Sequence, residues 1–550
     1  MKNKILKYAL QNAIHYEGKA NQGAVIGKLI QEDPSVKSKL KELAPEISKV
    51  IKDIQKLTVE EQTEKLKELA PELLEKKKKE ERKIPDLPNA KEGKVVMRVA
   101  PYPSGPLHIG NAKPFIMNDE LVKKYKGKLI LVMDDTIGSV EKTTDKEAYK
   151  LIPEGLDWLG IKYDKKILFK SDRLEIYYDY AKQLIEKDKA YVCTCDSEKM
   201  REYRRKAMIC DCRKHSVDVN LEGWGKMFNE YKEGEAALRI KTDMDHPNPA
   251  FRDRVLFRIS EREHPRVENK YRVWPLLEMS WAIDDHLLGM THILRGKDLM
   301  MESEMEYFIW DIFGWKHPEI IYSGLLQIEG IKLSKSKAQK EVESGEYIGW
   351  DDPRSWSLQS LKRRGIRPEA IRKFIISFGL NRNEIKVPIE TLFTENRKIL
   401  DEEVNRYFFV ENPQKISIKE APEIVAELPL HPDNKKRGMR KLKTNGKFYV
   451  SEDIKKSKTY RFMHLYNFKN EKFLGKEMDV KLKAKLIHWL PQDEVLDAEV
   501  FMPDGKTKKG VIEKTASKIK VDEMIQLERF GFVRLDKKEK NKLYFWYAHD

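Results

Sequence analysis

Residues 94–135 decide the fold of the chain: KVVMRVAPYPSGPLHIGNAKPFIMNDELVKKYKGKLILVMDD. The first seven residues of this stretch predict a short strand, and the proline- and glycine-rich residues 101–110 predict a tight loop. An amphipathic pattern that ends in glycine predicts a helix over 111–127, and KLILVMDD predicts a second strand. Strand, loop, helix and strand form a βαβ unit, so we expect a parallel sheet here.

The rest of the chain predicts a multidomain protein, in keeping with its 550 residues. Residues 1 to about 80 have apolar positions every three to four residues, which predicts helices, and a charged linker that ends in prolines places a boundary near Glu92. After about Val387, short alternating strands with turn signals predict an all-β sandwich or barrel. The expected fold class is multidomain α/β plus all-β, divided into 1–85, 93–190, 191–272, 273–387 and 388–550.

Composition restricts the class of protein. Lys and Arg number 106 against 90 Asp and Glu, a net charge of +16, and 40% of the residues are hydrophobic. That apolar share excludes global disorder. No apolar run is long enough to span a membrane and residues 1–20 lack a signal-peptide core, so we expect a cytoplasmic protein without a membrane partner. The positive charge suits a polyanionic partner, although a Lys- and Glu-rich composition is also typical of proteins from hot environments.

All the cysteines of the chain lie in two Cys-x-Cys pairs, Cys193 with Cys195 and Cys210 with Cys212. Four thiolates at this spacing can close a tetrahedral shell around zinc, which leaves no open position for catalysis, so we expect a structural zinc site. Two disulfides or four unconnected thiols are the alternatives, and disulfides are disfavoured in an intracellular protein. His215 could substitute as a ligand, but a surface histidine is the simpler interpretation.

Two segments suit a nucleotide phosphate. The first is PYPSGPLHIGN at 101–111, between a strand and a helix, where His108 can donate a hydrogen bond and Gly110 permits a close approach to the backbone. The second is KLSKSK at 332–337, whose lysines and hydroxyls can gather around a triphosphate. Taken singly, each could be an ordinary surface loop. Together they indicate a phosphate-binding element after the first strand and a basic loop after the last.

The two segments resemble the His-Ile-Gly-His and Lys-Met-Ser-Lys-Ser signatures of class I aminoacyl-tRNA synthetases. Further blocks resemble the archaeal-type glutamyl-tRNA synthetases over nearly the whole chain, among them SDRLEIYYDYA, YVCTCD, RIKTDMDHPNPAFRD, AIDDHLLGMTHILRGKD and LKRRGIRPEAIR. The resemblance implies a Rossmann-like catalytic domain with an inserted, zinc-bearing domain that binds the acceptor end. It also implies a C-terminal β-barrel region that binds the anticodon.

The resemblance further implies ATP-dependent, Mg-assisted ligation of L-glutamate to tRNA(Glu), and possibly to tRNA(Gln), by a monomer. Glutamate would attack the α-phosphate of ATP to give glutamyl-adenylate and pyrophosphate, and the 3′-terminal hydroxyl of the tRNA would then take the glutamyl group. No side-chain nucleophile is required, because positioning and charge stabilisation carry the rate.

Site residues follow from the resemblance by position, and a structural role is the alternative for each. Three residues would act catalytically: His108, Lys332 and Lys335. Those that would bind ATP are Pro101, Gly105, His108, Gly110, Asn111, Lys332, Ser334, Lys335 and Ser336. Those that would bind the amino acid are Arg98, Ala100, Tyr102, Asp134, Leu277, Trp281 and Arg295. Two arginines suit a dicarboxylate ligand, because guanidinium groups pair bidentately with carboxylates.

The sequence departs from the family pattern around this site. Residues that differ from those usual in the family, most of which are polar or small there, stand at seven positions: Tyr102, Asn111, Val132, Ile137, Leu277, Trp281 and Leu325. A pocket that loses hydrogen-bond donors loses affinity, so two interpretations follow. One is a working glutamyl enzyme, which the retained 332–337 loop and both arginines favour. The other is a paralogue with altered amino-acid choice, or one that binds tRNA without charging it.

Two basic clusters suit tRNA phosphates, and strand aromatics could stack on unpaired anticodon bases. They are KKRGMRKLKTNGK at 435–447 and KTKKG at 506–510. Either cluster could instead be a solvated loop. Charge reversal at Lys441 and Lys443 is expected to weaken tRNA binding and to flatten its dependence on salt.

Overall fold

The computed structural model describes residues 1–15, 18–33, 36, 40–73, 84–139, 143–331 and 335–550. The chain divides into two compact units, Met1–Glu81 and Arg82–Asp550. In the described residues, no helix is long and apolar enough to cross a membrane. The predicted site residues Lys332 and Ser334 lie outside the described residues, and of Lys335 and Ser336 only the backbone is described.

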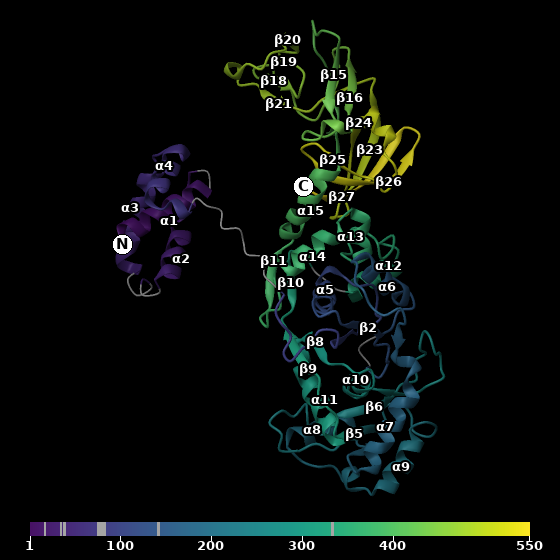
Figure 1. The fold of residues 1–550 in the computed structure, drawn as a ribbon. Helices are drawn as coiled ribbons and strands as arrows, with labels where there is room; N and C mark the ends of the chain where they lie inside the picture. The colour runs from purple at the N-terminus through teal and green to yellow at the C-terminus, as the bar shows by residue number, and fades with distance from the viewer. Residues whose placement is uncertain (16–17, 34–35, 37–39, 74–83, 140–142, 332–334) are drawn as a thin grey trace. The chain divides into compact units, whose positions relative to one another are not determined.

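The first unit is helical, as the periodicity predicts, and its helices enclose a core of their own (Figure 1). The fourth helix begins at Thr58, whose hydroxyl accepts from the backbone N–H of Glu61 while the Glu61 carboxylate accepts from the Thr58 N–H. Such a capping box fixes a helix start by pairing two otherwise orphaned donors. The helices are α1 (Lys2–His15), α2 (Gln22–Glu32), α3 (Leu40–Ile54) and α4 (Val59–Leu69).

The predicted βαβ unit is confirmed. Strands β1 (Val96–Val99) and β2 (Lys128–Met133) pair in parallel, and helix α5 (Ile109–Lys124) connects them. A short third strand, β3 (Leu168–Phe169), continues the parallel sheet beside β2. The strands are almost wholly buried, which is usual for a parallel sheet covered by helices on its faces. The helices predicted over 141–190 are α6 (Ala148–Trp158) and α7 (Leu174–Glu186).

The second α/β part adds a two-stranded parallel sheet beside the first one, from a distant segment. Strand β8 (His292–Gly296) is parallel to β9 (Glu319–Ser323), and Thr291, just before β8, donates its backbone N–H to the Val96 carbonyl at 3.0 Å. Strand β8 therefore starts beside β1, although about two hundred residues separate them. Helices α10 (Leu277–Leu287) and α11 (Met300–Phe313) flank β8 in sequence. A further parallel pair joins β10 (Leu326–Glu329) to β11 (Ile385–Pro388).

The insertion between the two α/β halves forms an antiparallel sheet that bears the cysteines at one edge. Its strands pair in chain order: β4 (Ala190–Cys193), β5 (Ala237–Ile240), β6 (Val255–Ile259) and β7 (Val273–Pro275). Two helices lie between β4 and β5, α8 (Ser197–Arg205) and α9 (Val217–Lys226). Strand β7 leads directly into α10. The inserted sheet is therefore joined to the helix that carries Leu277 and Trp281, two residues predicted to bind the amino acid.

Strands were expected from about Val387, and this prediction is wrong for the first part of that region. Residues Glu390–Glu403 form helix α15, whose buried positions are Leu392, Asn396 and Leu400. The polar Asn396 interrupts the apolar stripe, and it is buried because its amide accepts from the Arg367 N–H at 2.8 Å and contacts His549 at 2.9 Å. The other helices here are α12 (Lys335–Glu343), α13 (Leu358–Arg364) and α14 (Pro368–Ile376).

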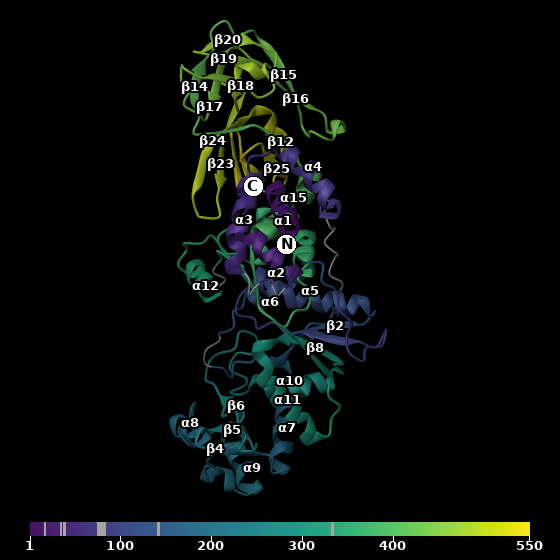
Figure 2. The same cartoon turned by 90° about the vertical axis from the view of Figure 1, so that its left-hand side faces the viewer.

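Beyond α15 the chain is built from strands, as predicted (Figure 2). Their buried side chains form two main cores. The largest sheet has the order β12-β25-β26-β27-β23-β24-β13. Its two edge strands, β12 and β13, come first in the chain, and the last strand of the chain, β27, lies in the middle. Its strands are β12 (Asn405–Tyr407), β13 (Phe409–Glu411), β23 (Val495–Phe501), β24 (Thr507–Glu513), β25 (Met524–Leu527), β26 (Gly531–Glu539) and β27 (Lys542–His549). The remaining strands are β14 (Gln414–Ser417), β15 (Ile424–Pro429), β16 (Met439–Thr444), β17 (Lys447–Val450), β18 (Thr459–Phe462), β19 (Asn467–Lys469), β20 (Lys472–Gly475), β21 (Lys485–Ile487) and β22 (Leu490–Pro491).

Two consecutive arginines of helix α13 bind residues of strands β26 and β27 and so join the α/β part to the strand region. Arg363 pairs with both carboxylate oxygens of Asp536 at 3.0 Å. The central carbon of its guanidinium lies 3.8 Å from the centroid of the Trp546 ring. Arg364 is fully buried, and burial lowers its pKa to about 10. Its guanidinium donates to the Ala548 carbonyl at 2.6 Å.

Candidate functional site

The first signature loop lies at the carboxyl edge of the parallel strands, where ligands bind in open α/β sheets. Strand β1 ends at Val99, and the Pro101 carbonyl then accepts from the Asp134 N–H just beyond β2 at 3.0 Å. The Pro103 carbonyl accepts from the Asp145 N–H at 2.8 Å. These bonds hold the loop against the end of the neighbouring strand.

Gly105 is required inside this loop. Its φ is +133°, a conformation that side chains rarely adopt, and a Cβ there would lie 3.2 Å from the Trp350 ring. The contact brings a residue far along the chain against the loop. Leu107 also accepts from the Leu358 N–H at 2.8 Å, so the segment around α13 buttresses the loop from behind.

Asn111, where the family usually has histidine, caps the helix that follows the loop. Its side-chain oxygen accepts from the His108 N–H at 3.3 Å, and its own N–H donates to the His108 carbonyl at 2.8 Å. A residue three positions into a helix that reaches back to the first N–H performs half of a capping box. The asparagine thus keeps the helix N-terminus formed, with its remaining N–H groups and dipole available to an anion.

A pocket of about 490 Å³ lies between the first signature segment and residues 325–331, which precede the second. One side comes from the start of α5 and the other from β10 and the turn that leads to the 332–337 loop. Lys386 of β11 also borders the pocket. The lining residues are His108, Gly110, Asn111, Leu325, Leu326, Gln327, Ile328, Glu329, Gly330, Ile331 and Lys386.

Arg98, predicted to bind the amino acid, is buried and paired inside the protein. Its Nε and Nη2 both donate to the Asp285 carboxylate, the second at 2.7 Å. Arg98 lies on β1 and Asp285 on α10, so the ion pair ties the first strand to a helix of the second half. Two-point pairing of this kind fixes the guanidinium plane as well as its position.

Arg295 is held in the same way by another carboxylate. Its two terminal nitrogens donate to Glu306 of α11 at 2.8 and 3.0 Å, and Nη1 also donates to the Ser303 hydroxyl at 2.9 Å. Asp285 lies 3.9 Å away and links this pair to Arg98. Burial raises the pKa of Glu306 to about 7, against the opposing effect of the Arg295 charge.

Trp281 lies at the centre of this cluster. The carbon of the Arg98 guanidinium is 4.6 Å from the indole ring, that of Arg295 is 4.8 Å, and the Lys170 ammonium is 5.1 Å. Cations near an aromatic face are attracted by its negative π-surface, most strongly when water is excluded. The bulky residue at this position therefore holds three buried cations in one place.

Asp134 completes the cluster through a lysine that the sequence analysis missed. The Lys170 ammonium lies 2.9 Å from the Asp134 carboxylate and donates to the Ser280 hydroxyl at 2.8 Å. Lys170 is fully buried, and burial lowers its pKa. The predicted residues Arg98, Asp134, Trp281 and Arg295 therefore meet in one buried, charge-paired network.

The other residues predicted to bind the amino acid are Ala100, Tyr102 and Leu277. Ala100 and Tyr102 follow β1 and are half-buried, and burial raises the pKa of Tyr102. Leu277 is the first residue of α10 and is half-buried. Among the remaining departures, Val132 and Ile137 are core residues.

Leu325 is the departure that faces solvent. It is 50% exposed and borders the 490 Å³ pocket. An apolar side chain therefore stands at the edge of that pocket, where the resemblance predicts a basic residue.

Asp285, Glu306 and Lys170 are the functional candidates that sequence reasoning missed. Asp285 follows Trp281 by four residues on α10 and so shares its face, a spacing that would be a signal once a helix is assigned here. Glu306 and Lys170 carry no such signal, since their partners come from other elements.

The four cysteines converge at the edge of the inserted sheet. Their sulfur atoms all lie within 4.8 Å of one another, with 4.0 Å between Cys193 and Cys210 and 3.7 Å between Cys195 and Cys212. A zinc–sulfur bond of about 2.3 Å in a tetrahedron places neighbouring sulfurs about 3.8 Å apart, so the cluster fits a zinc ion. All the cysteines are free thiols, which excludes the disulfide alternative in this structure.

An arginine-rich pocket of about 340 Å³ separates the cysteine cluster from the loop after β2, and the sequence analysis did not identify it. Arg239 is buried with an Nε that has no partner, and its charge together with burial lowers the pKa of Arg258. In the part of the chain that the structure describes, neither Arg201 nor Arg258 forms an ion pair. Converging guanidinium groups without carboxylate partners suit phosphate oxygens.

Comparisons with known proteins match the chain along its length. Residues 94–402 match the family model "tRNA synthetases class I (E and Q), catalytic domain", and residues 404–487 and 486–536 match two models for the anti-codon binding domain of the same class.

Curated relatives match nearly end to end. A protein of Methanocaldococcus jannaschii named glutamate–tRNA ligase is 46% identical, with all of both chains covered. Proteins of the same name from Pyrococcus abyssi and Pyrococcus furiosus are 48% and 46% identical, with 99% of each chain covered. The chain therefore belongs to the class I tRNA synthetases of the glutamyl and glutaminyl (E and Q) group.

Proposed function

We propose that this protein ligates L-glutamate to tRNA in an ATP-dependent reaction. The observation that carries the proposal is the pocket that has His108 and Asn111 of the first signature on one side and, on the other, residues 325–331, which lead into the 332–337 loop. The names of the full-length relatives support glutamate as the amino acid. The competing possibility of a paralogue that binds tRNA without charging it has no observation in its favour.

ATP would bind with its phosphates at the start of α5. Gly110 and the helix N–H groups would receive phosphate oxygens, and His108 would donate a hydrogen bond to them. Pro101 and Gly105 would shape the loop, and Asn111 would hold the helix start. Mg²⁺ would enter with the ATP phosphates, which are its usual ligands.

The 332–337 loop would supply charge to the leaving pyrophosphate. Lys332, Lys335 and the hydroxyls of Ser334 and Ser336 are the groups assigned to this role by position. They follow the turn that borders the pocket opposite His108. In the first step the glutamate α-carboxylate attacks the α-phosphorus, and pyrophosphate leaves. In the second step a ribose hydroxyl of the tRNA 3′ end attacks the activated carbonyl, and AMP leaves.

Glutamate would bind at the network around Trp281. Arg98 and Arg295 would take its carboxylates and Asp134 its ammonium, while Ala100, Tyr102 and Leu277 would border the pocket. Each charged residue already has an internal partner of opposite charge, respectively Asp285, Glu306 and Lys170. These partners hold the side chains in place, so less rotamer entropy is lost when the substrate arrives.

Zinc would be held by Cys193, Cys195, Cys210 and Cys212. The distances between their sulfur atoms support a closed, four-ligand structural site. His215 is exposed at the end of a short helical turn, outside this group of ligand atoms. Such a site would stabilise the edge of the inserted sheet without taking part in the reaction.

tRNA would contact the chain at both ends of the second unit. The arginine-rich pocket beside the cysteine cluster would take acceptor-end phosphates, and the strand region after α15 would take the anticodon stem-loop. The proposed tRNA is tRNA(Glu), with tRNA(Gln) as a second substrate to be tested, and the proposed state is a cytoplasmic monomer.

The test is ATP–pyrophosphate exchange with each candidate amino acid, with and without unfractionated tRNA. Glutamate-dependent exchange is the expected result, together with charging of the tRNA. Exchange with a different amino acid would mean that the amino-acid specificity has changed, and the residues around Trp281 and Leu277 would be the first to test as its cause. Measurable tRNA binding without any exchange would overturn the proposal in favour of a non-catalytic paralogue.

A further inference from the structure

A second pocket lies at the opposite edge of the parallel strands. It has a volume of about 420 Å³ and is lined where the strands begin, by Val95 before β1, His292 at the start of β8 and Glu319 at the start of β9. Strand β1 is four residues long, so roughly 13 Å of strand separates this amino-edge pocket from the predicted site at the carboxyl edge. The two pockets share no lining residue.

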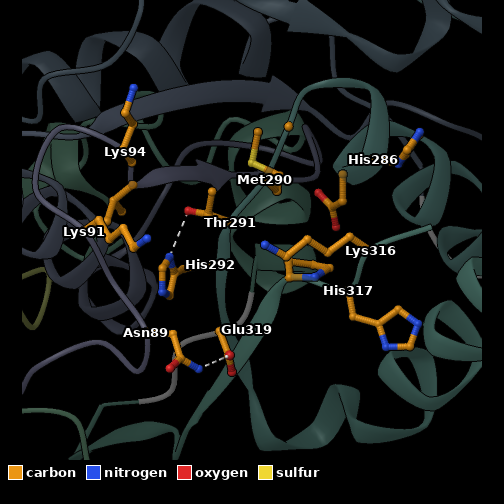
Figure 3. Close-up of a pocket in the computed structure, with 14 residues that line it drawn as sticks. Asn89, Lys91, Lys94, His286, Met290, Thr291, His292, Lys316, His317 and Glu319 are labelled. Atoms are coloured by element: carbon orange, nitrogen blue, oxygen red, sulfur yellow. Dashed lines mark hydrogen bonds between the residues drawn. The ribbon is translucent and has the colours of Figure 1, made fainter.

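Lysines from two chain segments surround the amino-edge pocket. Lys91 and Lys94 belong to the segment that precedes β1, and Lys316 belongs to the turn between α11 and β9. Figure 3 shows Lys91 and Lys316 extending toward the middle of the pocket from opposite sides, with His292 between them, whereas Lys94 extends away at the rim. Two ammonium groups therefore face one hollow.

These lysines differ from their neighbours in lacking a carboxylate partner. Close by on the same surface, Lys124 pairs with Asp86 at 2.9 Å and Lys128 pairs with Asp164 at 2.7 Å. Within the described ranges, no ion pair involves Lys91, Lys94 or Lys316. Three ammonium groups without ion pairs thus stand around the pocket against one carboxylate, Glu319, that has no cationic partner in the described residues.

Two carboxylates line the pocket, of which Asp285 is neutralised by an arginine and Glu319 is hydrogen-bonded to a neutral amide. Asp285 forms the buried ion pair with Arg98, and Glu319 accepts from the Asn89 amide at 2.7 Å (Figure 3). The floor is also polar and rigid, because His292 is buried with one ring nitrogen 2.8 Å from the Pro88 carbonyl and the other 2.8 Å from the Thr291 hydroxyl. A rigid floor with free ammonium groups above it favours a compact anion.

We propose that the amino-edge pocket binds a small phosphate-bearing anion between Lys91 and Lys316. The phosphate would receive hydrogen bonds from both ammonium groups above the imidazole of His292. The volume exceeds that of one phosphate group, which leaves room for a second phosphate or for the sugar of a nucleotide. This site is additional to ATP binding at the carboxyl edge, and its existence does not depend on the amino acid that the enzyme activates.

The pocket also adjoins the amino-acid network. Asp285 and His286, near the end of α10, line it, and Asp285 is the residue that holds Arg98. The segment before β1 forms the other wall and is fastened to the domain by the bond between Pro88 and His292. A bound anion would therefore join this segment to the turn between α11 and β9, beside the end of α10.

The experiment locates bound anion by hydrogen exchange of the full-length protein, without amino acid or tRNA. One arm adds inorganic pyrophosphate and the other adds UDP, whose base differs from that of ATP. Each is compared in the native protein, in Lys91→Glu/Lys316→Glu, and in Lys165→Glu/Lys166→Glu. The last pair is exposed and without ion-pair partners in the described chain, so it carries the same charge change away from the pocket.

We expect slower exchange of amides in 89–95 and 289–292, with at least a tenfold loss of affinity in the Lys91/Lys316 variant and none in the control. Equal affinity for UDP and pyrophosphate would assign the site to inorganic phosphates, and a preference for UDP would assign it to nucleotides. Protection confined to 101–111 and the 332–337 loop would overturn the proposal, because only the ATP site would then bind. Equal affinity in the two lysine variants would overturn it as well.

Discussion

Glu306 of α11 and Arg295 of β8 form a two-point ion pair inside the protein, with nitrogen–oxygen distances of 2.8 and 3.0 Å and side chains that are 0% and 3% exposed. Breaking such a pair without a replacement is strongly unfavourable, because it leaves a buried charge unpaired. A carboxylate of the substrate can bind Arg295 only by sharing the guanidinium with Glu306 or by displacing it. With Arg295 as the proposed glutamate ligand, Glu306 would therefore affect how tightly glutamate binds.

The affinity for glutamate should depend on pH through Glu306, whose pKa burial raises to about 7. Below that pH the carboxyl is protonated and Arg295 is free for the substrate, whereas above it the carboxylate competes. The KM for glutamate should therefore rise about tenfold between about pH 6 and about pH 8. Glu306→Gln should flatten this dependence in steady-state assays.

The control for that prediction is Glu302→Gln on the same helix. Glu302 pairs with Arg254 at 2.9 Å, outside the Trp281 network, so the variant should keep the native pH profile. If native protein and Glu306→Gln show the same profile, Glu306 does not compete with the substrate.

Trp281→Ala should cost stability and substrate affinity together. The indole is 6% exposed and lies against three cations, so truncation leaves a cavity next to charges and should lower the free energy of unfolding by about 3 kcal/mol. The KM for glutamate should rise at least tenfold as Arg98 and Arg295 lose their common support. Trp281→Phe keeps an aromatic face and should recover most of both losses in thermal unfolding and kinetics.

That comparison separates two explanations of the Trp281 effect. If Trp281→Phe is as impaired in KM as Trp281→Ala while stability is restored, the ring contributes through its size or its Nε1–H and not through cation–π contacts.

One zinc ion per chain is expected by elemental analysis of protein purified without chelator. Cys210→Ser should abolish zinc binding and lower the thermal stability of the inserted domain, because four thiolates close the shell. His215→Ala should retain the full zinc content. Zinc loss in His215→Ala, or its retention in Cys210→Ser, would contradict the assignment of ligands.

Charge reversal at Lys441 and at Lys443 of β16 should weaken tRNA binding to different extents, although the sequence predicts the same role for both. Both Lys441 and Lys443 lie on the exposed face of the strand, but Lys441 pairs with Glu427 at 2.7 Å and Lys443 has no ion pair in the described residues. Lys443→Glu should therefore weaken tRNA binding more, and should reduce the slope of log affinity against log salt by about 0.7 to 1. An unchanged slope in both variants would place this strand outside the tRNA interface.

The sequence by itself determined the local elements and the motifs that act through short spacing. The βαβ unit from β1 to β2 follows from apolar periodicity between a proline-rich loop and a glycine, and both are properties of neighbouring residues. The convergence of Cys193, Cys195, Cys210 and Cys212 follows in the same way, because each pair brings two sulfurs to the same edge over a short stretch of chain.

Helix α15 was missed for a physical reason. Asn396 breaks the apolar stripe that a periodicity argument needs, and it is tolerated only because Arg367 and His549 satisfy its amide from elsewhere in the fold. A buried polar residue looks like a surface residue until its partners are known.

Only the tertiary structure decided which partners the charged residues of the proposed amino-acid site have. The sequence assigned Arg98 and Arg295 to the substrate, but it could not show that Asp285 and Glu306 already hold them, or that Lys170 holds Asp134. The same holds for the amino-edge pocket, whose lysines come from segments more than two hundred residues apart. Periodicity reports which face of an element is buried, whereas ion pairs between elements depend on how the parallel strands and α10 pack, and that packing sets the partner of each buried charge.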